Sequence, residues 1–227
     1  MTKTSALAVT ICLLTISALG NSAARAQTTK LIVGYSAISG DQLPGWVAKE
    51  AGIFQRNGLD VQLVYFTGGT TAVMALISAD TPLSQVAGSA VVNSVLSGSD
   101  AVIVAAGITS LNYYLMARPD IKTPEQLKGG SVAISRFGSS SDFIARYALS
   151  RIGLTPGKDV TIVQIGSTPD RVAAVLTGRV QATVINPPAS IIAEKKGMTT
   201  LAGSAQARPS LPAYQRRYDE KIYSRTC

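Results

Sequence analysis

The strongest constraint on this chain is an alternation of strand-like and helix-like segments from about residue 30 to about residue 200. Short runs rich in β-branched and aromatic residues alternate with helical segments that begin at Gly, Ser or Thr. Such β-α repeats favour open, mostly parallel sheets with helices on both faces. The pattern therefore predicts an α/β fold with mostly parallel sheets flanked by helices.

For two of the expected elements the sequence predicts a specific feature, the burial of a strand and the cap of a helix. Residues 101–106 (AVIVAA) form a continuous apolar run, which is typical of a strand covered on both faces. Thr168 precedes Pro169 and is expected to cap the following helix. Strands are expected at 30–36, 61–66, 83–87, 101–106, 113–117, 131–135, 160–165 and 182–185, and helices at 44–51, 139–152 and 188–196 and from residues 68, 88 and 168.

The chain divides into four regions by composition. A loop with Pro119 and Pro124 interrupts the alternation, which then restarts, so we expect a first α/β lobe over 27–116 and a second over 117–203. Residues 204–227 form a basic tail without clear periodicity. Residues 1–26 have a different character from the rest.

The first 26 residues have the features of a secretory signal peptide. Lys3 supplies a positive start, residues 6–19 are apolar, and Ala24-Arg25-Ala26 fits the small-x-small cleavage pattern. Cleavage would remove Lys3 and Arg25, so 19 basic and 13 acidic residues would leave a net charge of +6. We expect an exported, periplasmic protein; the alternative is that this segment stays as a membrane anchor.

The chain lacks the residues and motifs that several classes of function require. The chain has no His, and its two Cys lie at positions 12 and 227, which excludes histidine catalysis and argues against a metal cluster or cofactor. The nucleotide-binding and nucleophile-elbow glycine motifs are absent. Basic residues do not alternate with aromatic ones in any stretch expected to be ordered, so a nucleic-acid groove is poorly supported.

Four loops before helices combine glycine with hydroxyl residues, at 36–40, 68–71, 88–89 and 138–141. Ligands of open α/β sheets bind beyond the carboxyl ends of the strands, and a helix N-terminus there can hold an anion. The alternative interpretation is capping and tight turns, which need the same residue types. Arg136 could pair with the anion or be a solvated loop cation, and Asn186 before two prolines could offer an amide or serve as a stiff turn.

The order and spacing of several segments of this chain resemble those of the periplasmic solute-binding proteins of ABC importers, in the nitrate/sulfonate/taurine and thiamine-precursor group. The resemblance covers residues 31–201. It rests on residues 44–54 (PGWVAKEAGIF), 57–61 (NGLDV), 68–69, 119–121, 127–129 and 178–183, followed by Asn186-Pro187-Pro188.

This resemblance implies a two-lobed protein that closes on a small solute and delivers it to a membrane permease. It implies no enzymatic activity and no cofactor, and we expect a monomer. In such proteins the loop after the first strand and the helix starts of both lobes hold the ligand. Carried over by position, the ligand-binding residues are Ser36, Gly69, Thr70, Ser89, Ser139, Ser140 and Asn186.

The chain departs from the family in one respect. Family members continue well beyond this length and return to complete the first lobe, whereas residues 204–227 do not look like a returning segment. We therefore expect a truncated, frame-shifted or shortened form with an incomplete first lobe.

Two other functions stay open at this point. The first is an exported enzyme of the same fold that uses a Ser nucleophile or a Lys nucleophile such as Lys49 or Lys128. The second is a basic protein that associates with anionic surfaces. The basic charge leans toward an anionic solute, of the sulfonate, nitrate, carboxylate or pyrimidine class.

Overall fold

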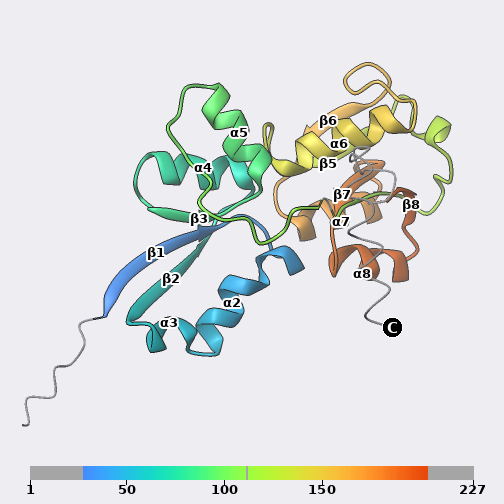
Figure 1. Cartoon of the computed structure of the whole chain (residues 1–227). Coiled ribbons are helices and arrows are strands. Elements are labelled where there is room, and N and C mark those ends of the chain that lie inside the picture. Colours follow the sequence, from blue (N-terminus) through green and yellow to red (C-terminus); the bar gives the residue numbers. More distant parts are fainter. Residues whose placement is uncertain (1–27, 111, 204–227) are drawn as a thin grey trace, which may run out of the picture.

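A computed structural model describes residues 28–110 and 112–203, which form two α/β lobes side by side (Figure 1). The predicted signal peptide and the basic tail lie outside these residues. The first lobe contains β1 (Thr29–Tyr35), α2 (Leu43–Glu50), α3 (Ile53–Arg56), β2 (Leu59–Tyr65), α4 (Gly69–Ile77), β3 (Leu83–Gln85) and α5 (Gly88–Leu96), with a short 3-10 turn at Gly40–Gln42.

The first lobe is built on a small parallel sheet in the order β2-β1-β3. Helices α2 and α3 lie on one side of it and α4 on the other (Figure 1). Its buried core is small, with Val73 of α4 packed against Ala90 and Val91 of α5.

The second lobe has a larger mixed sheet in the order β6-β5-β7-β4-β8, in which β4 runs antiparallel to both of its neighbours. Its elements are β4 (Tyr114–Ala117), β5 (Ser131–Ile134), α6 (Ser140–Arg151), β6 (Thr161–Gln164), α7 (Thr168–Leu176), β7 (Ala182–Ile185), α8 (Ala189–Lys195) and β8 (Thr199–Ala202), with a 3-10 turn at Pro124–Leu127. The α/β class and the flanking helices match the prediction.

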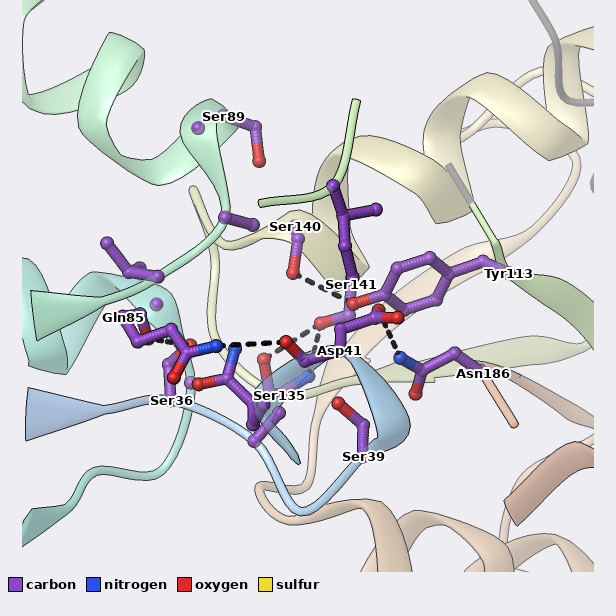
Figure 2. Close-up of a pocket in the computed structure, with 18 of the residues that line it drawn as sticks. Ser36, Ser39, Asp41, Gln85, Ser89, Tyr113, Ser135, Ser140, Ser141 and Asn186 are labelled. Carbon is purple, nitrogen blue, oxygen red and sulfur yellow. Dashed lines mark hydrogen bonds between the residues drawn. The ribbon is translucent and has the colours of Figure 1, made fainter. Parts of the chain in front are cut away.

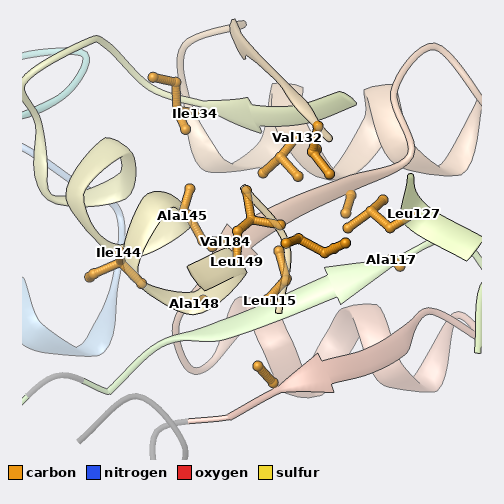
Figure 3. Close-up of a cluster of buried hydrophobic side chains, with 14 of the residues drawn as sticks. Leu115, Ala117, Leu127, Val132, Ile134, Ile144, Ala145, Ala148, Leu149 and Val184 are labelled. Atoms are coloured by element: carbon orange, nitrogen blue, oxygen red, sulfur yellow. The ribbon is translucent and has the colours of Figure 1, made fainter. Parts of the chain in front are cut away.

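Side-chain alternation along the strands divides the core of the second lobe into two clusters. Val132 and Ile134 of β5 face α6, where they pack with Ile144 and Leu149 (Figure 3). The intervening Ala133 belongs to the cluster that α7 and α8 cover on the opposite face. Both faces of the central strands are therefore buried, as their near-continuous apolar sequences predict.

The expected lobe boundary at 116/117 falls inside strand β4. β4 pairs with β7 and β8 along Tyr114–Ala117, so residues 114–116 belong to the second sheet and not to the first lobe. The strand is apolar on both faces, and the larger sheet supplies neighbours on both of its edges.

The prediction of a strand at residues 101–106 is wrong. This run is irregular, and Val102 and Val104 are 74% and 80% exposed. An apolar run becomes a strand only where a neighbour accepts its hydrogen bonds, and among the described residues no strand pairs with it. Instead it forms part of the passage from the first lobe to the second.

The cap of α7 is also displaced by one residue. Ser167, not Thr168, is the N-cap, and its hydroxyl accepts from the Asp170 amide at 3.3 Å. The residue with extended backbone occupies the cap, and Thr168 is already helical.

Replacing Ser167 with alanine should lower the free energy of unfolding by about 1 kcal/mol, because an amide of the first helical turn loses its acceptor. Chemical denaturation measures the change. The control is Ser150→Ala on the exposed face of α6, which should change stability by less than about 0.5 kcal/mol. Equal effects of the two substitutions would contradict the assigned cap.

Candidate functional site

A cavity of about 700 Å³ lies between the lobes, where the chain leaves the carboxyl ends of several strands. All four of the glycine- and hydroxyl-rich loops reach it: Ser36 follows β1, Gly69 begins α4, Ser89 lies in the first turn of α5, and Ser140 begins α6. Figure 2 shows polar side chains from both lobes directed into the same space. A concave site with few convergent polar groups suits a small ligand.

Five of the seven candidate residues line this cavity, namely Ser36, Gly69, Ser89, Ser140 and Asn186. Thr70 and Ser139 do not. The hydroxyl of Thr70 donates instead to the carbonyl of Phe137 across the lobes at 2.9 Å. Proximity to a helix start identified loops that reach the cavity, but it did not distinguish hydroxyls that face the cavity from those that hold the loop.

Ser139 belongs to a closed cluster of three hydroxyls. Its Oγ lies 2.9 Å from the Oγ atoms of both Ser135 and Ser141, and it donates to the carbonyl of Arg136 at 2.7 Å. Ser141 also accepts from the Ser135 amide at 2.8 Å. Because Ser139 is completely buried, its role is to fix the start of α6, and Ser140 and Ser141 are the residues at the cavity wall.

Arg171 is the main site residue that sequence reasoning missed. It lines the cavity from α7 and is only 4% exposed. Four of the five guanidinium N–H groups donate to neutral acceptors: the carbonyls of Gly166 and Val184 and the hydroxyls of Thr168 and Thr183. The detectable signal was its spacing, three and four residues before the buried Ala174 and Val175.

The positive charge of Arg171 has no carboxylate partner in the described part of the chain. Among residues 28–110 and 112–203 the ion pairs are Arg118–Asp120 and Arg146–Asp142. Burial lowers the pKa of Arg171 to about 10, because removal from water disfavours the charged form. At neutral pH it is still a cation, held at a cavity wall by neutral dipoles.

Tyr113 lines the same cavity as Arg171, and the charge of Arg171 acts on its hydroxyl. Burial raises the pKa of its phenol, the hydrogen bond to Ser140 opposes that shift, and the charges of Asp41 and Arg171 act on it with opposite signs. Its hydroxyl lies 3.4 Å from the Oγ of Ser140 (Figure 2). Tyr113 is therefore a neutral hydrogen-bonding group close to both charges.

Direct hydrogen bonds join the lobes on two sides of the cavity. On one side Asn186 Nδ2 donates to Asp41 Oδ2 at 2.7 Å, and the Gly40 amide donates to the Pro187 carbonyl at 3.2 Å. On the other, Asn93 Nδ2 donates to the Gly138 carbonyl at 2.9 Å, beside the Thr70 bond. The lobes are thus in contact in this conformation.

The other candidate groups lie outside the cavity wall. Arg136 is exposed, Lys128 is exposed, and Lys49 donates to the Val61 carbonyl at 2.6 Å. Within the described part of the chain, no cluster of acidic or Cys side chains is arranged to hold a metal ion. None of the helices in that part combines the length and apolarity that a membrane span requires.

Comparison with known proteins assigns the family. The model of the family described as "NMT1/THI5 like" matches residues 40–202. This chain belongs to the NMT1/THI5-like family. The match includes all of the cavity loops except the beginning of the loop after β1.

One curated relative of this NMT1/THI5-like chain is "Putative binding protein YtlA" of Bacillus subtilis (strain 168). The two sequences are 27% identical over 165 residues, which is 71% of this chain and 49% of the relative. The chain therefore spans about half the length of the curated relative that it matches.

Solved structures show the same fold. The alkanesulfonate-binding protein SsuA of Xanthomonas axonopodis pv. citri, bound to MOPS, has a TM-score of 0.67 at 22% identity, over 78% of this chain and 62% of that one. The periplasmic nitrate-binding protein NrtA of Synechocystis PCC 6803 has a TM-score of 0.61 at 19% identity, over 77% and 52%. Both of these proteins are binding proteins by name, and the fold of this NMT1/THI5-like chain is that of periplasmic binding proteins.

Proposed function

We propose that this protein is the exported substrate-binding component of an ABC import system and captures a small anion in the cavity between its lobes. The observation that supports this most directly is Arg171, a buried cation at the cavity wall with which no carboxylate of residues 28–110 and 112–203 forms an ion pair. The starts of α6 and α7 face the same space through Ser140 and Thr168, and helix N-termini favour negative charge.

The ligand contacts that we propose follow from the side chains at the wall. Arg171 supplies the charge, and Ser36, Ser89, Ser140 and Asn186 supply hydrogen bonds. Gly69 lies at the wall without a side chain, and its close neighbours are Ala90 and Val86. We add Ser141 to the ligand-binding residues that the family resemblance implies. Thr70 and Ser139 contribute indirectly, because their hydroxyls bond to the backbone of the loop before α6 and hold it in place. A ligand that contacts both lobes would stabilise the closed conformation.

Binding without chemistry fits the site better than catalysis does. The hydroxyls of Ser139 and Ser141 at the start of α6 bond to each other, to Ser135 and to backbone groups, and Ser140 Oγ lies 3.4 Å from the hydroxyl of Tyr113. Lys49 and Lys128, the lysines of the enzyme alternative, do not line the cavity. We propose that the captured solute is released unchanged to a permease of the inner membrane, by a monomeric periplasmic protein.

A thermal-shift screen of the protein from Gln27 onward tests this function with alkanesulfonates, nitrate, alkylphosphonates, carboxylates and aminopyrimidines. We expect at least one anion to raise the midpoint of unfolding in a saturable manner and to be recovered intact after incubation. Turnover of the ligand would support the enzyme alternative, and no saturable shift with any of these compounds would overturn the proposal.

The pH dependence of anion binding follows from the pKa of Arg171. The charged form persists below about pH 10, so affinity should be constant from neutral pH to about pH 9 and then fall about tenfold per pH unit above 10. Calorimetry with a non-titrating alkanesulfonate measures it. A fall that begins near neutral pH would show that another group supplies the charge.

A further inference from the structure

The two lobes carry net charges of opposite sign. Residues 28–110 contain 3 basic and 5 acidic side chains, a net charge of −2, whereas residues 112–203 contain 11 basic and 6 acidic ones, a net charge of +5. Of those 11 basic side chains, Arg171 lines the cavity and the others do not. Most of the positive charge of the second lobe therefore takes no part in holding the solute.

The topology of the second sheet collects this charge at one end of the lobe. Strands β5, β6 and β7 are parallel, so the loops that enter them lie together, at the end opposite the cavity. β4 ends and β8 begins at the same end, because Ala117 pairs with both Ala182 and Thr199. We call this end the basic end, and its basic side chains are Arg118, Lys122, Lys128, Arg151, Lys158, Arg179, Lys195 and Lys196.

Most of the positive charge at the basic end is exposed and unpaired. Arg118 forms an ion pair with Asp120, whereas the other seven basic side chains are exposed and form no ion pair with the described residues. Four acidic side chains share this end, so its net charge is +4; they are Asp120, Glu125, Asp159 and Glu194. A charge of this size on one face attracts an extended anionic surface.

Stabilisation of helix ends explains only part of this charge. Arg151 and Lys195 are the last residues of α6 and α8, where a cation interacts favourably with the helix dipole. Lys122, Lys128 and Lys158 lie outside the last turn of any α-helix. These loop cations have no such role within the fold, so a partner outside the lobe is the better explanation for them.

An anionic membrane fits the basic end better than a nucleic acid does. The basic segments 118–128, 151–158, 178–179 and 194–197 contain no aromatic residue on which a base would stack. The permease that the proposed function requires lies in a membrane, where phospholipid headgroups present a continuous anionic surface. Clusters of Lys and Arg bind such surfaces through charge alone.

We propose that the basic end docks on anionic phospholipid headgroups and holds the protein at the membrane surface. The first lobe contacts the opposite end of the second lobe, through bonds such as that from Thr70 to Phe137, so its net negative charge points away from the headgroups. The cavity also lies at that opposite end and stays clear of the membrane. The inference does not depend on the captured solute, so it can fail while the proposed function stands.

Sedimentation with sucrose-loaded vesicles tests the proposal on the protein from Gln27 onward. We expect binding to vesicles with about one third phosphatidylglycerol in phosphatidylcholine, none to pure phosphatidylcholine, and release as salt rises from about 0.05 M to about 0.5 M. Absence of binding to the anionic vesicles would overturn the proposal. Binding that survives the higher salt would also overturn it, because it would indicate insertion of apolar side chains such as the exposed Leu96, Val102 and Val104 of the first lobe.

Double substitutions that each remove two positive charges locate the contact. We expect Lys195→Gln/Lys196→Gln to weaken vesicle binding about tenfold. Because Lys195 also stabilises the end of α8, a second pair outside that helix is needed, and Lys158→Gln/Arg179→Gln should have a similar effect. Unchanged binding in both double variants would contradict docking through the basic end.

Matched controls remove the same charge elsewhere in the chain. They are Lys30→Gln/Arg56→Gln on the exposed surface of the first lobe and Arg216→Gln/Arg217→Gln in the basic tail, and each should weaken vesicle binding less than about threefold. A control pair that weakens binding as much as the basic-end pairs would place the contact elsewhere. Retention on single-stranded DNA at a salt concentration that releases the vesicles would identify a nucleic-acid surface and overturn the proposal.

Discussion

Replacing Arg171 with methionine is expected to weaken anion binding about a hundredfold. Methionine fills similar space with an uncharged side chain, so the cavity loses its buried cation while α7 keeps its packing. The size of the effect follows from the burial of Arg171, because charged hydrogen bonds to a buried group are worth more than those at the surface. Calorimetry with the best anion of the thermal-shift screen measures the loss.

The matched control for this prediction is Arg136→Met. Arg136 carries the same charge next to the serine run but is exposed and lies outside the cavity wall, so its loss should change affinity less than about threefold. Arg171→Lys retains the charge but cannot reach all four acceptors of the guanidinium, and we expect an intermediate loss of about tenfold. Binding at wild-type strength in the methionine variant would contradict the assignment of Arg171.

Replacing Gly68 with alanine is expected to weaken ligand binding about ten- to a hundredfold by holding the lobes apart. Gly68 has a positive φ of 91°, and a Cβ there would lie 2.8 Å from Ser135 Oγ and 3.2 Å from Ser135 Cβ. Ser135 cannot easily give way, because its hydroxyl bonds to both Ser139 and Ser141. The added methyl group therefore opposes the approach of the two lobes.

Gly98→Ala separates this closure effect from backbone strain. Gly98 has a nearly identical φ of 97°, but a Cβ there would meet nothing within 4 Å. Both substitutions should lower the unfolding temperature through strain at a left-handed residue, and only Gly68→Ala should lower the affinity. Small-angle scattering with and without ligand would follow closure directly. Equal affinities of the two variants would show that contact at Gly68 does not limit it.

Local signals in the sequence were sufficient for most elements of the fold. The strand–helix alternation correctly predicted the α/β class, and residues such as Val132, Ile144 and Ala148 are buried as their spacing indicates. It failed for 101–106, because apolar character favours a strand but a strand also needs a neighbour, and no local signal supplies one. The expected lobe boundary failed for the same reason, because the neighbours that place β4 in the second sheet, β7 and β8, are distant in sequence.

For the candidate site, the sequence indicated which loops reach the cavity better than which of their side chains lie at its wall. Glycine and hydroxyl residues before helices identify segments that end at the same edge of parallel sheets, so all four loops reach the cavity. Whether a hydroxyl faces the ligand or holds its own loop depends on partners distant in sequence. Thr70 bonds to Phe137, 67 residues away, which no spacing within the loop indicates.

The sequence by itself determined the periodicity of burial, the helix starts and the absence of histidine chemistry, because each depends on residue types or on neighbours within a few positions. The tertiary structure alone decided which charges share the cavity. Asp41 after β1 comes close to Tyr113 and Arg171 of the second lobe only when the two lobes meet, and the burial that perturbs Arg171 arises from strands and loops elsewhere in the chain. The charges that face the cavity are therefore set by long-range contacts, whereas the fold class follows from local sequence patterns.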